Sequence, residues 1–268
     1  MEQGIAYELI LKPGERVLDI GGYDGGSALS FAKLVGNSGE VHTFEPHPVH
    51  YLKLCVSVRD VPYITPHCIA MSNRKGTTLF YSDLDFSNPK TALASTIVAD
   101  LANYDRLGEK IVAMKVETTS IDYFCKENFY IPDFIKVDVE GAENLVFEGS
   151  LEILEKIKPT FFFECSFLST QRAQLAHLPQ LIQYEYELYL VNIMYCWGKW
   201  TNDFLWNKNK LTRLSLSDIE AATNTSSPDI TTNLLAVHKS KLKDCPIFNQ
   251  CEISDYKTFY KELLKEKP

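Results

Sequence analysis

Two acidic residues near the middle of this sequence have the type and spacing that proton transfer needs. Asp138 and Glu140 follow the apolar run "DFIKV", which predicts a buried β-strand, and Gly141 then turns the chain. Strand alternation would put both acids on one face and Val139 on the other. A carboxylate within about 2.6–3.2 Å of an alcohol could accept its proton as a new bond forms at oxygen. Asp138 is the first candidate for this base, Glu140 the second, and Glu164, after the run "TFFF", the third.

A glycine-rich stretch earlier in the chain could hold a ligand. "DIGGYDGGSA", which begins at Asp19, directly follows the apolar residues "RVL". A glycine-rich turn between a strand and a helix lets the backbone approach a ligand closely and aims helix amides at it. Dinucleotide sites of this kind begin Gly-x-Gly, but Tyr23 stands where the second glycine would be needed after Gly21. A nicotinamide cofactor is therefore disfavoured.

The acids around this stretch favour a different ligand. Asp19, Gly21 and Gly25 are followed by Glu45, at the end of the next predicted strand "EVHTFE". This spacing suits S-adenosylmethionine, with its amino-acid end over the glycine turn and its ribose hydroxyls on Glu45. Asp19 would then accept a hydrogen bond from the ammonium group of the cofactor, directly or through water. The alternative interpretation is an ordinary strand–helix turn with a solvent-facing glutamate.

Two residues after the third predicted strand complete the expected cofactor site. Met71 and Ser72 stand where a sheet of this kind usually meets adenine, and the methionine side chain could cover one face of the ring. Clustered acids could also hold Mg²⁺, but no His or Asn completes a ligand set, so we expect no metal. The predicted cofactor-binding residues are Asp19, Gly21, Gly22, Tyr23, Gly25, Ser27, Glu45, Pro46, Met71, Ser72 and Asp138.

The elements that must position these residues alternate between strands and helices. Strands are predicted at "RVLDI", "EVHTFE", "YITPHCIAMS", "DFIKVDV" and "TFFFEC", and helices at residues 26–35, 49–58 and 143–154. This alternation predicts an α/β fold with a mostly parallel central sheet and helices on both faces. The carboxyl ends of its strands should form one rim. Residues 77–121 break the rhythm and predict an inserted antiparallel β-ribbon over that rim.

We expect a single domain over residues 1–268, with its core at about 14–170 and a variable, substrate-side region at 171–268. In the last region, "YELYLVN" and "NLLAVHK" predict two more strands, whose relative direction the sequence does not fix. A polar stretch between them contains three tryptophans that could form a stacking wall for a sugar, although ordinary packing explains them equally well. They are Trp197, Trp200 and Trp206.

Composition excludes several classes of protein. A net charge of −8 argues against unaided binding to nucleic acid, which needs clustered Lys and Arg. No stretch approaches the roughly 20 apolar residues of a membrane helix, and the start lacks the pattern of a signal peptide, so we expect a cytoplasmic protein. The seven cysteines include no CxxC pair, which favours reduced thiols. The sequence leaves a homo-oligomer open.

Five motifs together resemble a known family. In order, they are "VLDIGGYDGG", "VHTFEPHP", "TTSIDYF", "FIKVDVEGAENLVFEGSLEIL" and "PTFFFECS". They resemble the FkbM family of S-adenosylmethionine-dependent methyltransferases over roughly residues 14–170, and the Lys-x-Asp-x-Glu-Gly-x-Glu core that starts at Lys136 is the most specific part. Tyr23 departs from the family, whose members more often have a small polar residue such as Asn there.

The resemblance implies a class I methyltransferase fold, which is Rossmann-like, and usually methylation of a hydroxyl group on a sugar or a secondary metabolite. The expected partner is therefore a small-molecule acceptor. Two alternatives stay open. The enzyme could methylate nitrogen on a small molecule or peptide, which needs less help from a base, or the chain could be a non-catalytic module that binds the cofactor.

Overall fold

The computed structural model describes residues 7–83, 95–98, 111–166, 175–196, 199–200, 210–222 and 230–259. The chain divides into two compact units. Pro13–Ile157 forms the N-terminal unit, and the described residues from Lys158 onward form the C-terminal unit together with residues 7–12. The expected single domain over residues 1–268 stays a prediction.

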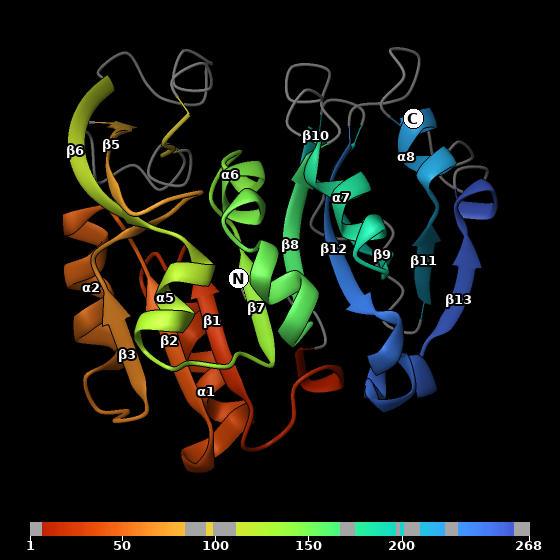
Figure 1. Ribbon diagram of the computed structural model, residues 1–268, viewed down its shortest axis with the longest axis horizontal. Coiled ribbons are helices and arrows are strands. Elements are labelled where there is room, and N and C mark those ends of the chain that lie inside the picture. The colour runs from red at the N-terminus through yellow and green to blue at the C-terminus, as the bar shows by residue number, and fades with distance from the viewer. Residues whose placement is uncertain are drawn as a thin grey trace. The chain divides into compact units, whose positions relative to one another are not determined.

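Four parallel strands form the main sheet of the N-terminal unit, in the order β7, β1, β2, β3 (Figure 1). The strands are β1 Arg16–Ile20, β2 Glu40–Phe44, β3 Ile64–His67 and β7 Phe134–Val137. The helices are α1 Gly26–Val35, α2 Pro48–Val58, α5 Ile121–Glu127 and α6 Glu143–Glu148, with shorter helical turns at Gly36–Ser38 and Ile153–Ile157. The alternation of strands and helices confirms the predicted α/β, Rossmann-like fold.

Helices cover both faces of this sheet. Phe44 and Thr43 are neighbours on β2, so their side chains point to opposite faces. The ring of Phe124 in α5 packs edge-on against Phe44, with the ring centroids 4.9 Å apart. On the face to which Thr43 points, Phe31 of α1 packs against Phe134 of β7 at 5.6 Å. Burial from both sides explains why the predicted central strands are nearly continuous apolar runs.

A separate three-stranded sheet contains the predicted ribbon. It has the order β4, β6, β5, with β4 Ala70–Met71, β5 Gly76–Asp83 and β6 Ile111–Thr119, and β5 and β6 are antiparallel as expected. The single strand predicted at "YITPHCIAMS" is wrong, because its first half pairs with β2 as β3 and its second half pairs with β6 as β4. Pro66 fits the edge position of β3, where a missing N–H leaves no bond unmade.

The helix predicted over residues 143–154 is interrupted. Helix α6 ends at Glu148, and Gly149 follows. A Cβ atom on Gly149 would lie 2.3 Å from the carbonyl oxygen of Ser72 and 2.8 Å from the Cβ of Ser120. Gly149 therefore permits a close approach of backbones that the helical pattern of the sequence did not reveal.

The C-terminal unit is built on a mixed sheet in the order β8, β12, β9, β11, β13, with β10 paired to β9. Strand β12 is antiparallel to both β8 and β9, so the two predicted C-terminal strands pair as antiparallel neighbours. Trp200 ends β10, whereas Trp197 and Trp206 lie outside the described residues. The strands are β8 Thr160–Ser166, β9 Tyr186–Cys196, β10 Lys199–Trp200, β11 Lys210–Leu214, β12 Ile230–His238 and β13 Glu252–Asp255.

Helices of the C-terminal unit are short. They are α7 His177–Gln183 and α8 Leu216–Ala222, with further helical turns at Tyr7–Leu9, Lys239–Asp244 and Pro246–Asn249. Within the described ranges of the whole chain, no helix combines the length and the apolar character that crossing a membrane requires.

Candidate active site

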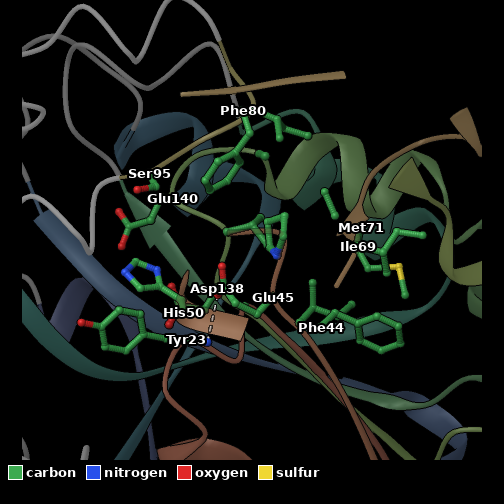
Figure 2. A pocket seen from close by; sticks show the side chains of 17 residues that line it. Tyr23, Phe44, Glu45, His50, Ile69, Met71, Phe80, Ser95, Asp138 and Glu140 are labelled. Atoms are coloured by element: carbon green, nitrogen blue, oxygen red, sulfur yellow. Dashed lines mark hydrogen bonds between the residues drawn. The ribbon is translucent and has the colours of Figure 1, made fainter. Parts of the chain in front are cut away.

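A pocket opens in the N-terminal unit where β1, β2 and β7 end (Figure 2). Its wall combines the glycine turn after β1, the residues after β2, and the turn between β7 and α6. Phe80 of the ribbon, together with Ser95 and Ile97, also lines the pocket. The pocket therefore lies at the rim that the carboxyl ends of the strands were predicted to form, and the ribbon contributes to its wall.

Strand register places three polar side chains together just behind this pocket. Asp19 pairs with Thr43 on one side and with Lys136 on the other. Asp19 is completely buried, and its carboxylate accepts hydrogen bonds from the hydroxyls of Thr43 (2.9 Å) and Ser27 (2.8 Å). Burial raises the pKa of Asp19, while Lys136 and both hydroxyls oppose this effect. The hydrogen bonds of Asp19 therefore connect β1 to β2 and to the start of α1 on the buried side of the glycine turn.

Lys136 connects this buried cluster to the pocket. Its ammonium lies 3.7 Å from a carboxylate oxygen of Asp19 and 3.2 Å from one of Asp138. It also donates a hydrogen bond of 2.9 Å to the carbonyl oxygen of Gly21. The ammonium of Lys136 therefore connects the end of β7 to the turn after β1 and holds the carboxylate of Asp138 in place. Such contacts are strong because one or both partners are charged.

The glycine turn depends on close backbone approach. Gly21 has a φ of +85°, and a Cβ atom there would lie 1.8 Å from the carbonyl oxygen of Asp138. A Cβ on Gly22 would lie 2.1 Å from the hydroxyl oxygen of Thr43. Tyr23 has a φ of +48°, a left-handed conformation that is uncommon for a side chain of its size. Strained residues of this kind cluster at functional sites.

Glu45 holds the turn from the end of β2. One of its carboxylate oxygens accepts from the backbone N–H of Tyr23 at 3.0 Å, and the other accepts from that of His47 at 2.8 Å. Burial raises the pKa of Glu45 to about 7. Because a carboxylate oxygen has two lone pairs, each oxygen retains one for a further donor. Glu45 lines the pocket and can therefore bind a vicinal diol.

The turn between β7 and α6 brings two acids to the pocket. Asp138 and Glu140 both line it, but β7 already ends at Val137, so strand alternation does not extend to Glu140. Glu140 has a φ of +53°. Oε1 of Glu143 accepts from the backbone N–H groups of Val139 (3.2 Å) and Gly141 (3.3 Å). Glu143 therefore stabilises the turn from which Asp138 and Glu140 project.

The predicted site residues separate into three groups. Those that line the pocket are Gly21, Tyr23, Glu45, Pro46, Met71, Asp138 and Glu140. Those in the same unit that do not line it are Asp19, Gly22, Gly25, Ser27 and Ser72. Glu164, the third candidate base, lies on β8 in the C-terminal unit. The individual roles of all these residues stay predictions.

Sequence reasoning missed several lining residues. The apolar wall contains Phe44 and Ile69 beside the predicted Met71, and His50 also lines the pocket. Phe44 is the last residue of β2 and directly precedes Glu45, and this position was the available signal for it. His50 lies in the first turn of the helix that follows Glu45, and this proximity was the one available signal for it.

Comparison with models of protein families shows the family of the chain. Residues 19–190 match the model of the methyltransferase FkbM domain. The chain belongs to the FkbM methyltransferase family. Family membership confirms the predicted resemblance and S-adenosylmethionine as the cofactor of this FkbM-family chain. No curated protein matches the chain in sequence at a significant level.

Solved structures similar to this FkbM-family chain include other methyltransferases. The methyltransferase FkbM from Methylobacillus flagellatus KT is 15% identical with a TM-score of 0.47, over 86% of this chain and 49% of that chain. The Aeropyrum pernix fibrillarin with natively bound S-adenosyl-L-methionine is 12% identical with a TM-score of 0.38, over 83% and 67%. The chain spans about half the length of the Methylobacillus protein. With TM-scores below 0.5, these likenesses add nothing to the family assignment.

Proposed function

We propose that the pocket of the N-terminal unit binds S-adenosylmethionine and that the chain methylates a hydroxyl oxygen of a small molecule, of the saccharide or secondary-metabolite type. The observation that carries this proposal is the position of Asp138. Its carboxylate lies at the pocket beside Gly21 and is held by Lys136 at 3.2 Å. An acid held at the end of β7, beside the glycine turn, is well placed to serve as a general base for an alcohol.

The lining residues fit the chemistry of the cofactor. Phe44, Ile69 and Met71 form an apolar wall of the kind that an adenine ring needs. Glu45 retains one lone pair on each carboxylate oxygen and so suits the two ribose hydroxyls. A buried imidazole nitrogen of His50 has no hydrogen-bond partner among the described residues and can serve a polar group of the ligand.

The proposed mechanism assigns each task to a residue. When bound, S-adenosylmethionine would supply an electrophilic methyl group, with the thioether of S-adenosylhomocysteine as the leaving group. Asp138 accepts the proton of the acceptor hydroxyl as the bond to carbon forms, and Lys136 holds the carboxylate in position. Glu140 is the second candidate for this base, because it lines the same pocket. Glu45 would hold the ribose hydroxyls of the cofactor through its two carboxylate oxygens.

The experiment is the substitution Asp138→Asn. It keeps the shape of the side chain but removes the base, so we expect S-adenosylhomocysteine to bind as it does to the wild type. Turnover should fall about 100-fold or more, since general-base catalysis contributes about 10²–10⁴-fold. Calorimetry gives the affinity. Release of S-adenosylhomocysteine, measured over a panel of sugars, alcohols and amines, identifies the acceptor class and gives the rate.

Asp60→Asn is the matched control, because Asp60 forms an ion pair with Arg59 at an exposed position. It should change neither affinity nor turnover. Turnover of Asp138→Asn at the wild-type rate at every pH would exclude Asp138 as the base. Methyl transfer to the amines of the panel alone would contradict the hydroxyl acceptor.

A further inference from the structure

His50 is held rigidly at the pocket by two aromatic neighbours. It lies in the first turn of α2, the residue is 2% exposed, and it lines the pocket. Its ring stacks on that of His47 with the centroids 4.3 Å apart. The ring of Tyr23 packs edge-on against it at 4.6 Å. These contacts fix the imidazole between the glycine turn and the start of α2.

Nε2 of His50 is buried and has no hydrogen-bond partner among the described residues. A buried polar atom without a partner costs free energy, so native structures rarely contain one unless a ligand or water serves it. Burial lowers the pKa of His50 to about 4, so the ring is neutral near pH 7. A neutral imidazole carries one N–H, on either Nδ1 or Nε2. In the tautomer with the proton on Nε2, this atom is a hydrogen-bond donor.

Donors are scarce among the side chains that line the pocket. Its ionisable acids are Glu45, Asp138 and Glu140, and no Lys or Arg lines the pocket in the described part of the chain. Among the described residues that line the pocket, Tyr23, Ser95 and His50 offer side-chain donors, and the Ser95 hydroxyl already donates to Ser82 at 2.9 Å. An anionic group of a ligand therefore finds few side-chain donors here, and Nε2 of His50 is a buried one without a bond to any described residue.

The pocket has two chemically different ends (Figure 2). Phe44, Ile69 and Met71 lie together at one end, and Tyr23, His50 and Glu140 lie at the other. The apolar end suits the adenine ring. An extended ligand whose adenine occupies that end presents its amino-acid group to the polar end, where a carboxylate needs a hydrogen-bond donor.

We propose that Nε2–H of His50 donates a hydrogen bond to the carboxylate of the cofactor's amino-acid end. The inference rests on the proposed function, because it requires S-adenosylmethionine to occupy this pocket. It assigns His50 a binding role: the imidazole positions the cofactor through its carboxylate and takes no part in moving the methyl group. A hydrogen bond of this kind also gives a reason for a histidine at a position where its ring packs against those of Tyr23 and His47.

The test compares two ligands that differ only at the end in question. S-adenosylhomocysteine has the amino-acid end, whereas 5′-methylthioadenosine lacks it. His50→Phe keeps the ring stacking and removes the donor, so we expect the affinity for S-adenosylhomocysteine to fall about tenfold or more. The affinity for 5′-methylthioadenosine should stay within about twofold of the wild type. His50→Gln, whose amide N–H can replace Nε2–H, should recover most of the loss. Calorimetry measures all three proteins with both ligands.

Two controls guard against a folding effect. Leu52→Ala changes a residue of the same helix that is 64% exposed and should leave both affinities unchanged. Thermal unfolding without ligand shows whether His50→Phe folds. In ¹⁵N-labelled wild type, S-adenosylhomocysteine should slow the exchange of the Nε2 proton of His50, a result that needs no substitution.

The outcomes separate this inference from the proposed function. Wild-type protein that binds neither ligand overturns the placement of the cofactor and the inference with it. Wild-type protein that binds both, together with a His50→Phe variant that binds S-adenosylhomocysteine equally well, overturns the inference alone. Equal loss of both ligands in His50→Phe also overturns it, because the contact would then lie at the adenosine end.

Discussion

Burial raises the pKa of three carboxyl groups around the pocket. It raises the pKa of Glu45 and of Glu143 to about 7, and it raises that of Asp19 as well. Each of these groups accepts hydrogen bonds, which favour the charged form and oppose the effect of burial. Glu45 and Glu143 therefore change charge near neutral pH, where an unfolded chain would already have ionised them.

Glu143→Gln should remove one source of pH-dependent stability. Because the folded pKa of Glu143 is above its unfolded value, the folded protein retains a proton that the unfolded chain has lost between about pH 4.5 and 7. The wild type consequently loses stability as pH rises through this window, and the loss is complete above it. Gln cannot titrate, and its oxygen can still accept from Val139 and Gly141.

We expect Glu143→Gln to match the wild type at pH 4 and to exceed its free energy of unfolding by about 1–3 kcal/mol at pH 8. Urea unfolding at several pH values measures this difference. Glu148→Gln is the control, since Glu148 makes an exposed hydrogen bond with Asn73. A stability difference that is the same at pH 4 and pH 8 would contradict the titration of Glu143.

Among the elements, the turn between β1 and α1 imposes the strictest demand on the sequence. Gly21→Ala combines a left-handed φ with a Cβ atom 1.8 Å from the carbonyl oxygen of Asp138. We expect it to separate the ends of β1 and β7, to lower the free energy of unfolding by about 3 kcal/mol or more, and to abolish binding of S-adenosylhomocysteine. Chemical unfolding and calorimetry measure the two effects.

Gly36→Ala provides the comparison for this element. Gly36 follows α1, has a φ of +67°, and nothing lies within 4 Å of the place that its Cβ would take. Its substitution should cost only backbone strain, about 1–3 kcal/mol, and should leave ligand affinity unchanged. If Gly21→Ala costs no more than Gly36→Ala, the close approach of Gly21 to Asp138 is not important for stability.

Elements also show how far local patterns predict a fold. Residues 26–35 form α1 as predicted, because the apolar period and the stop signal at Gly36 agree. The pattern over residues 143–154 looked equally helical, but contact with Ser72 requires glycine at position 149 and the helix ends there. Gly149 is needed for contacts with Ser72 and Ser120, which lie far away in the sequence, and such contacts do not change the periodic pattern of the helix.

For the whole molecule, ligand binding should affect the two units unequally. At about 100 times its Kd, S-adenosylhomocysteine stabilises the state that binds it by about 2.7 kcal/mol. Because the proposed site lies in the N-terminal unit, hydrogen exchange should slow most at residues 20–23, 44–50 and 138–142. The amides of β9 and β12 serve as internal references. Protection confined to the C-terminal unit would place the cofactor elsewhere.

The sequence by itself determined the alternation of strands and helices, the family and its cofactor, and the presence of Glu45 and Asp138 at strand ends. These follow from periodic patterns and from motifs that lie within short segments. Parallel strands of one sheet end at the same rim, so acids at those ends lie along one edge of the sheet without further information.

Only the tertiary structure decided which side chains line the pocket. Asp19, which was predicted to accept from the cofactor directly or through water, is completely buried among Ser27, Thr43 and Lys136 and does not line the pocket, and its role toward the cofactor stays a prediction. His50 lines the pocket, although nothing in its sequence surroundings assigned it a partner. The direction in which a side chain points and its burial depend on contacts between segments far apart in the chain. A local sequence pattern does not contain those contacts.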